Sequence, residues 1–189
     1  QFLALSATPL ALPLLSRLAM AGTGSNFIEI KAKPADWSLA GPDRASSKLW
    51  TYNGVSPGPE IRVRQGERVR VRLVNELEEP TSIHWHGIRI DNAMDGVSGL
   101  TQEAVPPGET FDYDFVAPDA GTYWYHAHNK SWSQVGRGLY GPLIVDEPEP
   151  AFDRARDLTL VLDDWRLDRN YRLDTASFGA MMDWSHGGR

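Results

Sequence analysis

Residues 68–73 read RVRVRL, a strict alternation of charged and apolar side chains. Residues two apart on a β-strand point to the same face, so this stretch predicts a strand with one buried and one solvent-exposed face. The same alternation recurs in four other short runs, at residues 28–31, 61–64, 111–115 and 123–126. Turn-forming residues bound these runs, for example at 53–54 and 106–108. The pattern favours an all-β fold, an antiparallel sandwich or barrel, with no convincing amphipathic helix in residues 27–147.

Length, charge and cysteine content exclude several classes of protein. The 189 residues suffice for one domain and part of a second. A net charge of −6 gives no electrostatic case for nucleic-acid binding. The arginines of residues 62–64 and 68–72 alternate with apolar residues, which indicates the solvent-exposed face of strands and not a phosphate-binding patch. The chain has no cysteine, which excludes disulfides and any thiolate metal site within it.

The first 23 residues differ in composition from the rest of the chain. Residues 2–21 are apolar, contain Pro9 and Pro13, and lead into the small-residue run 19–22. These are features of the hydrophobic core and cleavage side of a signal peptide, and the prolines argue against a transmembrane anchor. We expect residues 1–23 to be a signal-peptide remnant and the protein to be periplasmic or secreted, with no membrane span after processing. A twin-arginine signal is one option, because the first five residues resemble the stretch after the arginine pair of such signals.

A polar, proline-punctuated stretch, DEPEP at residues 146–150, predicts a linker. After it, residues 158–162 predict a new apolar strand. The residues that remain are too few to close a second sandwich. We therefore expect a first domain at residues 24–147, followed at residues 148–189 by a linker and the incomplete start of a second domain.

Four of the five histidines form two pairs, each with one residue between its members: His84 with His86, and His126 with His128. Each pair lies within or at the end of a predicted strand, so its two imidazoles point to one face. If the two strands are neighbours, four imidazoles converge on one patch. Such donors suit Cu, Zn, Fe or Ni, but not Mg or Ca. The alternative is four strand histidines with ordinary hydrogen-bond partners; His186 stands alone, and no role is assigned to it.

The two histidine pairs sit in longer motifs that resemble a known family. Residues 81–87 (TSIHWHG) and 121–128 (GTYWYHAH) are similar to the two amino-terminal copper motifs of the multicopper oxidases, the group of laccases and bacterial copper-efflux oxidases. Further similar stretches lie at residues 52–54, 57–59, 94–97, 101–102, 106–108 and 138–145. The resemblance covers residues 27–147 well and 157–189 loosely. It implies a cupredoxin-like Greek-key β-sandwich, followed by the start of a second cupredoxin-like domain.

The resemblance also implies a role for each paired histidine. His84 would bind the type 2 copper, and His86, His126 and His128 would bind the type 3 pair. In the family, this trinuclear cluster takes eight histidines, four of them from a carboxyl-terminal domain that also holds the blue type 1 copper. The resemblance therefore implies about four coppers per full-length chain. It also makes the carboxyl-terminal domain a necessary partner, so this chain alone is expected to be inactive.

The activity implied is an enzyme that couples one-electron oxidation of phenols, aromatic amines or metal ions to four-electron reduction of O₂ to water. Asp95 lies eleven residues after His84, where the family places an acidic residue near the cluster. A proton relay is the role implied for it, and a plain turn at Asp95-Gly96 is the alternative. The aromatic residues beside the ligands, namely Trp85, Trp124 and Tyr125, are expected to pack around them and support them.

Two other functions remain open from the sequence. One is a copper-free periplasmic cupredoxin that acts as a scaffold or interaction module, although all four histidines argue against it. The other is a two-domain copper oxidase or a nitrite reductase relative. In the family, substrate pockets lie near the blue copper, outside these residues.

Overall fold

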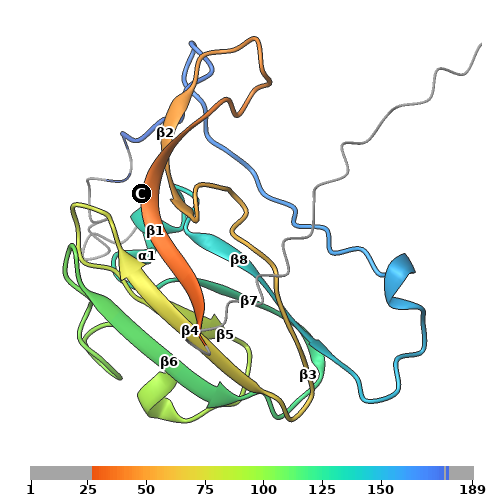
Figure 1. The fold of residues 1–189 in the computed structure, drawn as a ribbon. Helices are drawn as coiled ribbons and strands as arrows, with labels where there is room; N and C mark the ends of the chain where they lie inside the picture. Colours follow the sequence, from red (N-terminus) through yellow and green to blue (C-terminus); the bar gives the residue numbers. More distant parts are fainter. Residues whose placement is uncertain (1–26, 177, 179–189) are drawn as a thin grey trace, which may run out of the picture.

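The computed structural model describes residues 27–176 and residue 178. The predicted signal peptide at residues 1–23 and His186 lie outside these described residues. Eight strands form two four-stranded sheets that face each other as a sandwich (Figure 1). The all-β prediction is therefore confirmed. Within the described residues, no helix is both long and apolar enough to cross a membrane.

The first sheet has the strand order β2-β1-β4-β6. Its strands are β1 (Ile28–Trp37), β2 (Ser47–Tyr52), β4 (Arg68–Asn75) and β6 (Thr110–Val116). Here β1 runs antiparallel to β2 and parallel to β4, while β4 and β6 are antiparallel.

The second sheet has the strand order β3-β8-β7-β5. Its strands are β3 (Ile61–Arg64), β5 (Ile83–His86), β7 (Gly121–Ala127) and β8 (Tyr140–Asp146). The pair β3–β8 is parallel, whereas β8–β7 and β7–β5 are antiparallel. The sandwich is thus mixed and not purely antiparallel as the periodicity predicted, because alternation reveals a half-buried face but not the direction of the neighbouring strand.

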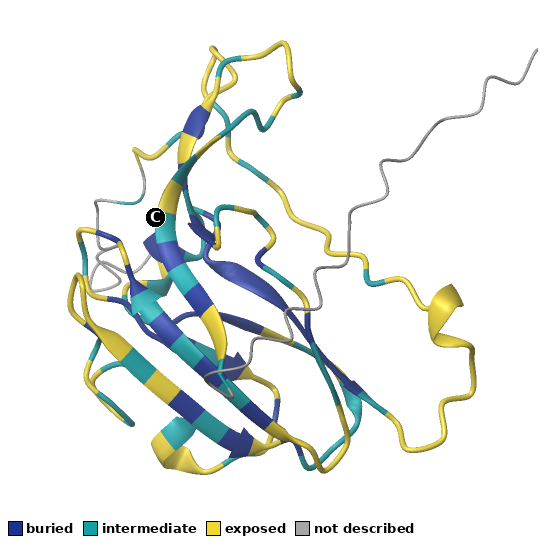
Figure 2. Ribbon diagram, in the orientation of Figure 1, coloured by how far each residue is buried: buried dark blue, intermediate teal, exposed yellow. Residues whose placement is uncertain are grey.

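The core lies between the sheets, and the alternation of β4 shows how the sequence builds it (Figure 2). Val69, Val71 and Leu73 are buried against the second sheet. On the outer face, Arg72 bridges to Asp112 of β6, with 2.7 Å between the guanidinium Nε and a carboxylate oxygen. Apolar burial on one face and cross-strand charge pairs on the other fix the register of this strand.

The described residues also contain three single turns of helix, two between strands and one after the last strand, and none is an amphipathic helix. They are η1 (Asn92–Met94), α1 (Ser131–Gln134) and η2 (Arg154–Arg156). Of these, α1 follows β7 directly and η1 precedes the predicted turn at Asp95-Gly96.

Residues 158–162 do not form the predicted strand: among the described residues they have no backbone pairing. A strand exists by pairing with a neighbour, and apolar content alone does not supply one. The side chains of Leu158, Leu160 and Leu162 are 80, 83 and 94 % exposed. The segment is attached by side-chain contacts instead, such as the hydrogen bond of 2.6 Å that Thr159 Oγ1 donates to Glu60 Oε2.

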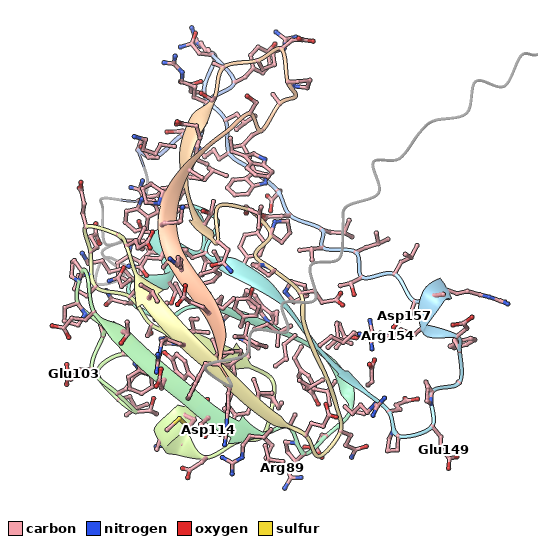
Figure 3. The ribbon with its side chains drawn as sticks, viewed as in Figure 1. Arg89, Glu103, Asp114, Glu149, Arg154 and Asp157 are labelled. Atoms are coloured by element: carbon pink, nitrogen blue, oxygen red, sulfur yellow. The ribbon has the colours of Figure 1, made fainter. Side chains whose placement is uncertain are left out.

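The linker is fixed to the sandwich by an ion-pair network around Arg62 of β3. The side chain of Arg62 is only 10 % exposed, and its guanidinium bridges to Asp146 at the end of β8 with 2.6 Å between Nη2 and Oδ1. It also contacts Asp157, which lies beside Arg154 in the segment that follows the linker (Figure 3). The prediction that Arg62 is exposed to solvent on its strand was therefore wrong. A carboxylate from the neighbouring strand pairs with its charge and allows the side chain to be covered.

Candidate metal centre

Strands β5 and β7 bring the two histidine pairs together. Their register places His84 opposite His126, and His86 opposite Trp124. Because residues two apart share a face, these imidazoles point to the side of the sheet opposite the buried Trp85. The prediction that the strands carrying the two pairs are neighbours is confirmed.

The four imidazole rings form one patch. The ring centroid of His84 lies 5.5 Å from that of His86, 5.3 Å from that of His126 and 5.1 Å from that of His128. His86 Nδ1 is 3.2 Å from His126 Nε2. One ring nitrogen from each of His84, His86 and His126 lies within 4.8 Å of the others. Since metal–nitrogen bonds are about 2 Å long, this spacing fits metal ions held between the rings.

The backbone of Asp95 orients His84. The Nδ1 atom of His84 lies 2.7 Å from the carbonyl oxygen of Asp95 and 3.4 Å from its carboxylate Oδ1. An Nδ1–H that donates to this carbonyl leaves Nε2 as the free lone pair for a metal. The next residue, Gly96, has a φ of +80°, and a Cβ there would lie 1.7 Å from the carbonyl oxygen of Ile83. Only glycine therefore allows this loop to approach β5 closely enough for the contact.

Burial keeps His126 in the neutral imidazole form that binds metals. Only 6 % of its surface is exposed, and its Nδ1 lies 3.0 Å from the carbonyl oxygen of Ala127. Burial lowers the pKa of His126 from 6.5 to about 4, and the three neighbouring histidines act in the same direction. His126 is therefore a neutral imidazole at pH 7, and neutral imidazole is the ligand form. The donor set of the patch, four imidazoles, fits copper.

The aromatic neighbours divide between the two faces of the sheet. Trp85 and Tyr125 are buried in the core, on the face opposite the histidines, with ring centroids 5.8 Å apart. They have the packing role expected of them, but their rings do not pack around the histidines. Trp124 is instead on the histidine face. Its indole stacks on His126 with centroids 4.1 Å apart, and lies 5.0 Å from His86. Trp124 therefore covers one side of both imidazoles and restricts their rotation.

No sequence pattern identifies two further residues that support the site. Tyr113 of β6 accepts a hydrogen bond of 2.8 Å at its hydroxyl oxygen from the backbone N–H of Ile83, next to His84. Gln134, at the end of α1, is a fully buried polar residue bonded to the entry of β5. A tyrosine in a strand and a glutamine after a turn are ordinary in sequence, and only tertiary proximity reveals these contacts.

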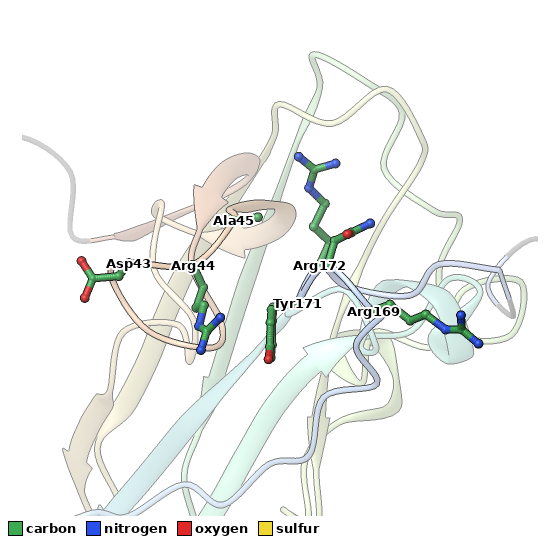
Figure 4. Close-up of a pocket in the computed structure, with 7 residues that line it drawn as sticks. Asp43, Arg44, Ala45, Arg169, Tyr171 and Arg172 are labelled. Atoms are coloured by element: carbon green, nitrogen blue, oxygen red, sulfur yellow. The ribbon is translucent and has the colours of Figure 1, made fainter.

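A hollow of about 540 Å³ lies away from the histidines, between the connection of β1 to β2 and residues 169–172. Its arginines, Arg44, Arg169 and Arg172, point in different directions (Figure 4). Arg44 stacks on the ring of Tyr171 at 4.2 Å. Without convergent charges the hollow has no shared position for an anion, so the histidine patch is the better candidate site.

Comparison with known proteins identifies the family. The chain matches the sequence profile described as multicopper oxidase over residues 35–150, a span that contains both histidine pairs and more than half of the chain. The chain belongs to the multicopper oxidase family. Members of this family are copper-dependent oxidoreductases, so copper is the metal that the family implies for the patch.

Individual multicopper oxidases agree with this assignment. A copper resistance protein A homolog of Pseudomonas syringae pv. tomato is 47 % identical over 117 residues, which are 61 % of this chain and 19 % of that protein. A multicopper oxidase of Mycobacterium tuberculosis is 42 % identical over 133 residues, 70 % of this chain and 25 % of that protein. The chain thus spans about a fifth to a quarter of these relatives.

Solved structures confirm the predicted cupredoxin-like sandwich. The crystal structure of a multi-copper oxidase from Pseudomonas thermotolerans has a TM-score of 0.74 and 46 % sequence identity to this chain. The match covers 81 % of this chain and 37 % of that one. A second structure, Lac15 from a marine microbial metagenome, has a TM-score of 0.67 and 44 % identity, covering 78 % of this chain and 39 % of that one.

Proposed function

We propose that this chain is the amino-terminal part of an oxidase that couples one-electron oxidation of a small substrate to four-electron reduction of O₂ to water. The substrate classes are phenols, aromatic amines and metal ions. One observation carries the proposal: ring nitrogens of three histidines, from two adjacent strands, lie within 4.8 Å of one another in a chain of this family. Relatives are named laccase and copper resistance protein, which is compatible with more than one substrate class.

Under this proposal His84 binds the type 2 copper, and His86, His126 and His128 bind the type 3 pair. The low pKa of His126, caused by burial, supports the role, because a ligand that is neutral at pH 7 needs no deprotonation before it binds. Copper, when bound, would supply the electron transfer to oxygen. The full-length protein would hold about four coppers, with the other cluster ligands and the blue site in a carboxyl-terminal domain.

The residues of this chain would orient ligands and handle protons. The carbonyl of Asp95 holds the ring of His84 in one tautomer. The Asp95 carboxylate lies 3.4 Å from the same ring and is partly exposed, so it has access both to the patch and to solvent. We assign it the relay of protons to the site of oxygen reduction. The indole of Trp124 covers one side of the imidazoles of His86 and His126.

The proposed domain organisation rests on the same resemblance, and the proposed location rests on the apolar composition of residues 2–21. Residues 1–23 would be an export signal, of the twin-arginine type, and residues 24–147 the first cupredoxin domain. Residues 148–189 would be the linker and the start of a second cupredoxin domain. The exposed leucines of residues 158–162 support this, since an apolar row of this kind is normally covered. The partners would be the carboxyl-terminal domain, O₂ and the reducing substrate, in the periplasm or outside the cell.

The test is the purified full-length protein, loaded with copper and assayed for O₂ uptake with a phenol, an aromatic amine and a reduced metal ion. The expected result is uptake with at least one of these donors, with four substrate electrons consumed per O₂ and no released peroxide. A protein that binds copper but releases peroxide as its product, or that takes up no O₂ with any donor, would contradict the proposal. If the protein is instead a copper-free scaffold, it will bind no copper.

A further inference from the structure

The sheet does not hold His128 directly. The ladder between β5 and β7 ends with the pair Ile83 and Ala127, so His126 is part of the sheet and His128 lies just beyond it. Even so, the ring of His128 lies 5.1 Å from that of His84. A side chain beyond the end of a ladder keeps such a position only if the turn that carries it is attached elsewhere.

A buried amide attaches that turn to the entry of β5. Gln134, the last residue of α1, is fully buried. Its Nε2 donates to the carbonyl oxygen of Pro80 at 2.9 Å, and its Oε1 accepts from the hydroxyl of Thr81 at 2.7 Å. The same Pro80 carbonyl accepts a hydrogen bond of 2.6 Å from Asn129 Nδ2. The chain just after His128 is thereby bonded to the chain just before β5.

We propose that Gln134 is a positioning residue that sets the separation between His128 and His84. A buried amide whose donor and acceptor are both used has one favourable orientation, so it fixes the distance between the two segments it joins. Without it, the Thr81 hydroxyl loses its partner in the protein interior, and the turn is held to the entry of β5 by Asn129 and by the exposed pair of Lys130 and Glu79. The inference rests on the proposed function in treating the two histidines as copper ligands.

Asn75 provides a matched control for a purely structural role. It is also a fully buried amide, and its Nδ2 donates to the carbonyl oxygens of Glu79 at 2.9 Å and Val105 at 2.8 Å. Its Oδ1 accepts from the backbone N–H of Leu77 at 3.0 Å. These bonds organise the same approach to β5 but do not include the turn after β7. Truncation of Asn75 should therefore destabilise the domain without releasing His128.

The experiment compares Gln134→Ala and Asn75→Ala in the full-length protein. Copper retention is measured by dialysis against graded chelator, together with the electron paramagnetic resonance of the type 2 copper and the near-ultraviolet absorption of the coupled type 3 pair. Both variants should melt at a lower temperature than wild type. Only Gln134→Ala should lose cluster copper, with an affinity lower by about 10- to 100-fold, while the blue absorption is unchanged. If Gln134→Ala does not fold, Gln134→Met, which keeps the volume but not the two hydrogen bonds, should show the same loss.

Equal copper loss in the Asn75 and Gln134 variants, or loss in neither, would overturn the proposal. A crystal structure of the Gln134 variant gives a second readout that needs no copper. The His84–His128 ring separation should exceed the wild-type 5.1 Å, and an unchanged separation would also overturn the proposal. If wild type binds no copper while this separation still changes, the proposed function fails and the positioning role of Gln134 stands.

Discussion

The Nδ1 atom of His84 lies 2.7 Å from the backbone carbonyl oxygen of Asp95. This contact joins the loop after β5 to the first ring of the histidine patch. It depends on Gly96, whose backbone passes so close to Ile83 that a Cβ would collide with the Ile83 carbonyl oxygen. A sharp turn in the loop and the orientation of a candidate ligand are therefore one structural feature.

Substitution of Gly96 should damage both stability and copper binding. Gly96→Ala adds a Cβ at a φ of +80° and 1.7 Å from the Ile83 carbonyl oxygen, so the loop must move and withdraw the Asp95 carbonyl from His84. The expected loss is about 3 kcal/mol in the free energy of unfolding, measured in urea, together with weaker copper binding. The control is Gly99→Ala, at a φ of +77° but with open space around the new Cβ. It should cost about 1 kcal/mol and spare copper. Equal effects in the two variants would contradict the account.

The carboxylate of Asp95 can be tested separately from its backbone. Asp95→Asn keeps the carbonyl contact to His84 and the side-chain shape but removes the acidic group. Copper content should stay at the wild-type level, while the rate of O₂ reduction falls by about 10²-fold, as expected for loss of a general acid. Copper content and turnover are measured on the same preparation. A wild-type rate would mean that the Asp95 carboxylate does not relay protons and that Asp95 acts only through its backbone.

Removal of one cluster histidine should stop O₂ reduction but leave the blue copper site unchanged. His126→Ala in the full-length protein should abolish O₂ reduction, because His126 is the most buried ring of the patch and contacts His86. The blue absorption should remain, since that site is assigned to another domain. The measurements are O₂ uptake and the visible spectrum. Normal turnover in this variant would show that the ligand assignment is wrong.

The partly buried ion pair of Arg62 and Asp146 predicts an acid-sensitive contribution to stability. The hydrogen bond from Arg62 lowers the pKa of Asp146. A carboxyl with a lowered folded-state pKa stabilises the fold above its unfolded value, about 3.9, and loses this contribution as the pH falls through the folded pKa. Asp146→Asn should therefore lower the free energy of unfolding at pH 7 by about 2 kcal/mol, and the difference should shrink below pH of about 4.

Urea unfolding at pH 7 and at pH of about 3 checks this prediction. The control is Asp119→Asn, which removes the exposed pair with Arg89 and should change stability little at either pH. A penalty for Asp146→Asn that is as large at the acidic pH as at pH 7 would show that packing, and not charge, holds the linker.

The fold and the histidine patch were predictable because both depend on local periodicity. Alternation identified β4 and its neighbours, and the spacing of His84 and His86 put both rings on one face. The parallel pairs β1–β4 and β3–β8 were not predictable, since strand direction depends on the path of the chain between sheets. The burial of Arg62 was missed for a related reason: its partner, Asp146, is distant in sequence.

The prediction of a strand at residues 158–162 was wrong because apolar content does not provide a pairing partner. Gln134 was missed because nothing in its local sequence distinguishes a buried, bonded glutamine from a solvated one. Contacts of this kind depend on which segments the sandwich brings together. They are therefore the part of the site that only coordinates reveal.

The most direct test of the central claim is anomalous X-ray diffraction at the copper edge from crystals of the copper-loaded full-length protein. Copper peaks are expected at about 2 Å from ring nitrogens of His84, His86, His126 and His128, and each copper should also be bound by histidines from elsewhere in the protein. Copper found only at other sites, with none within bonding distance of these four rings, would contradict that claim.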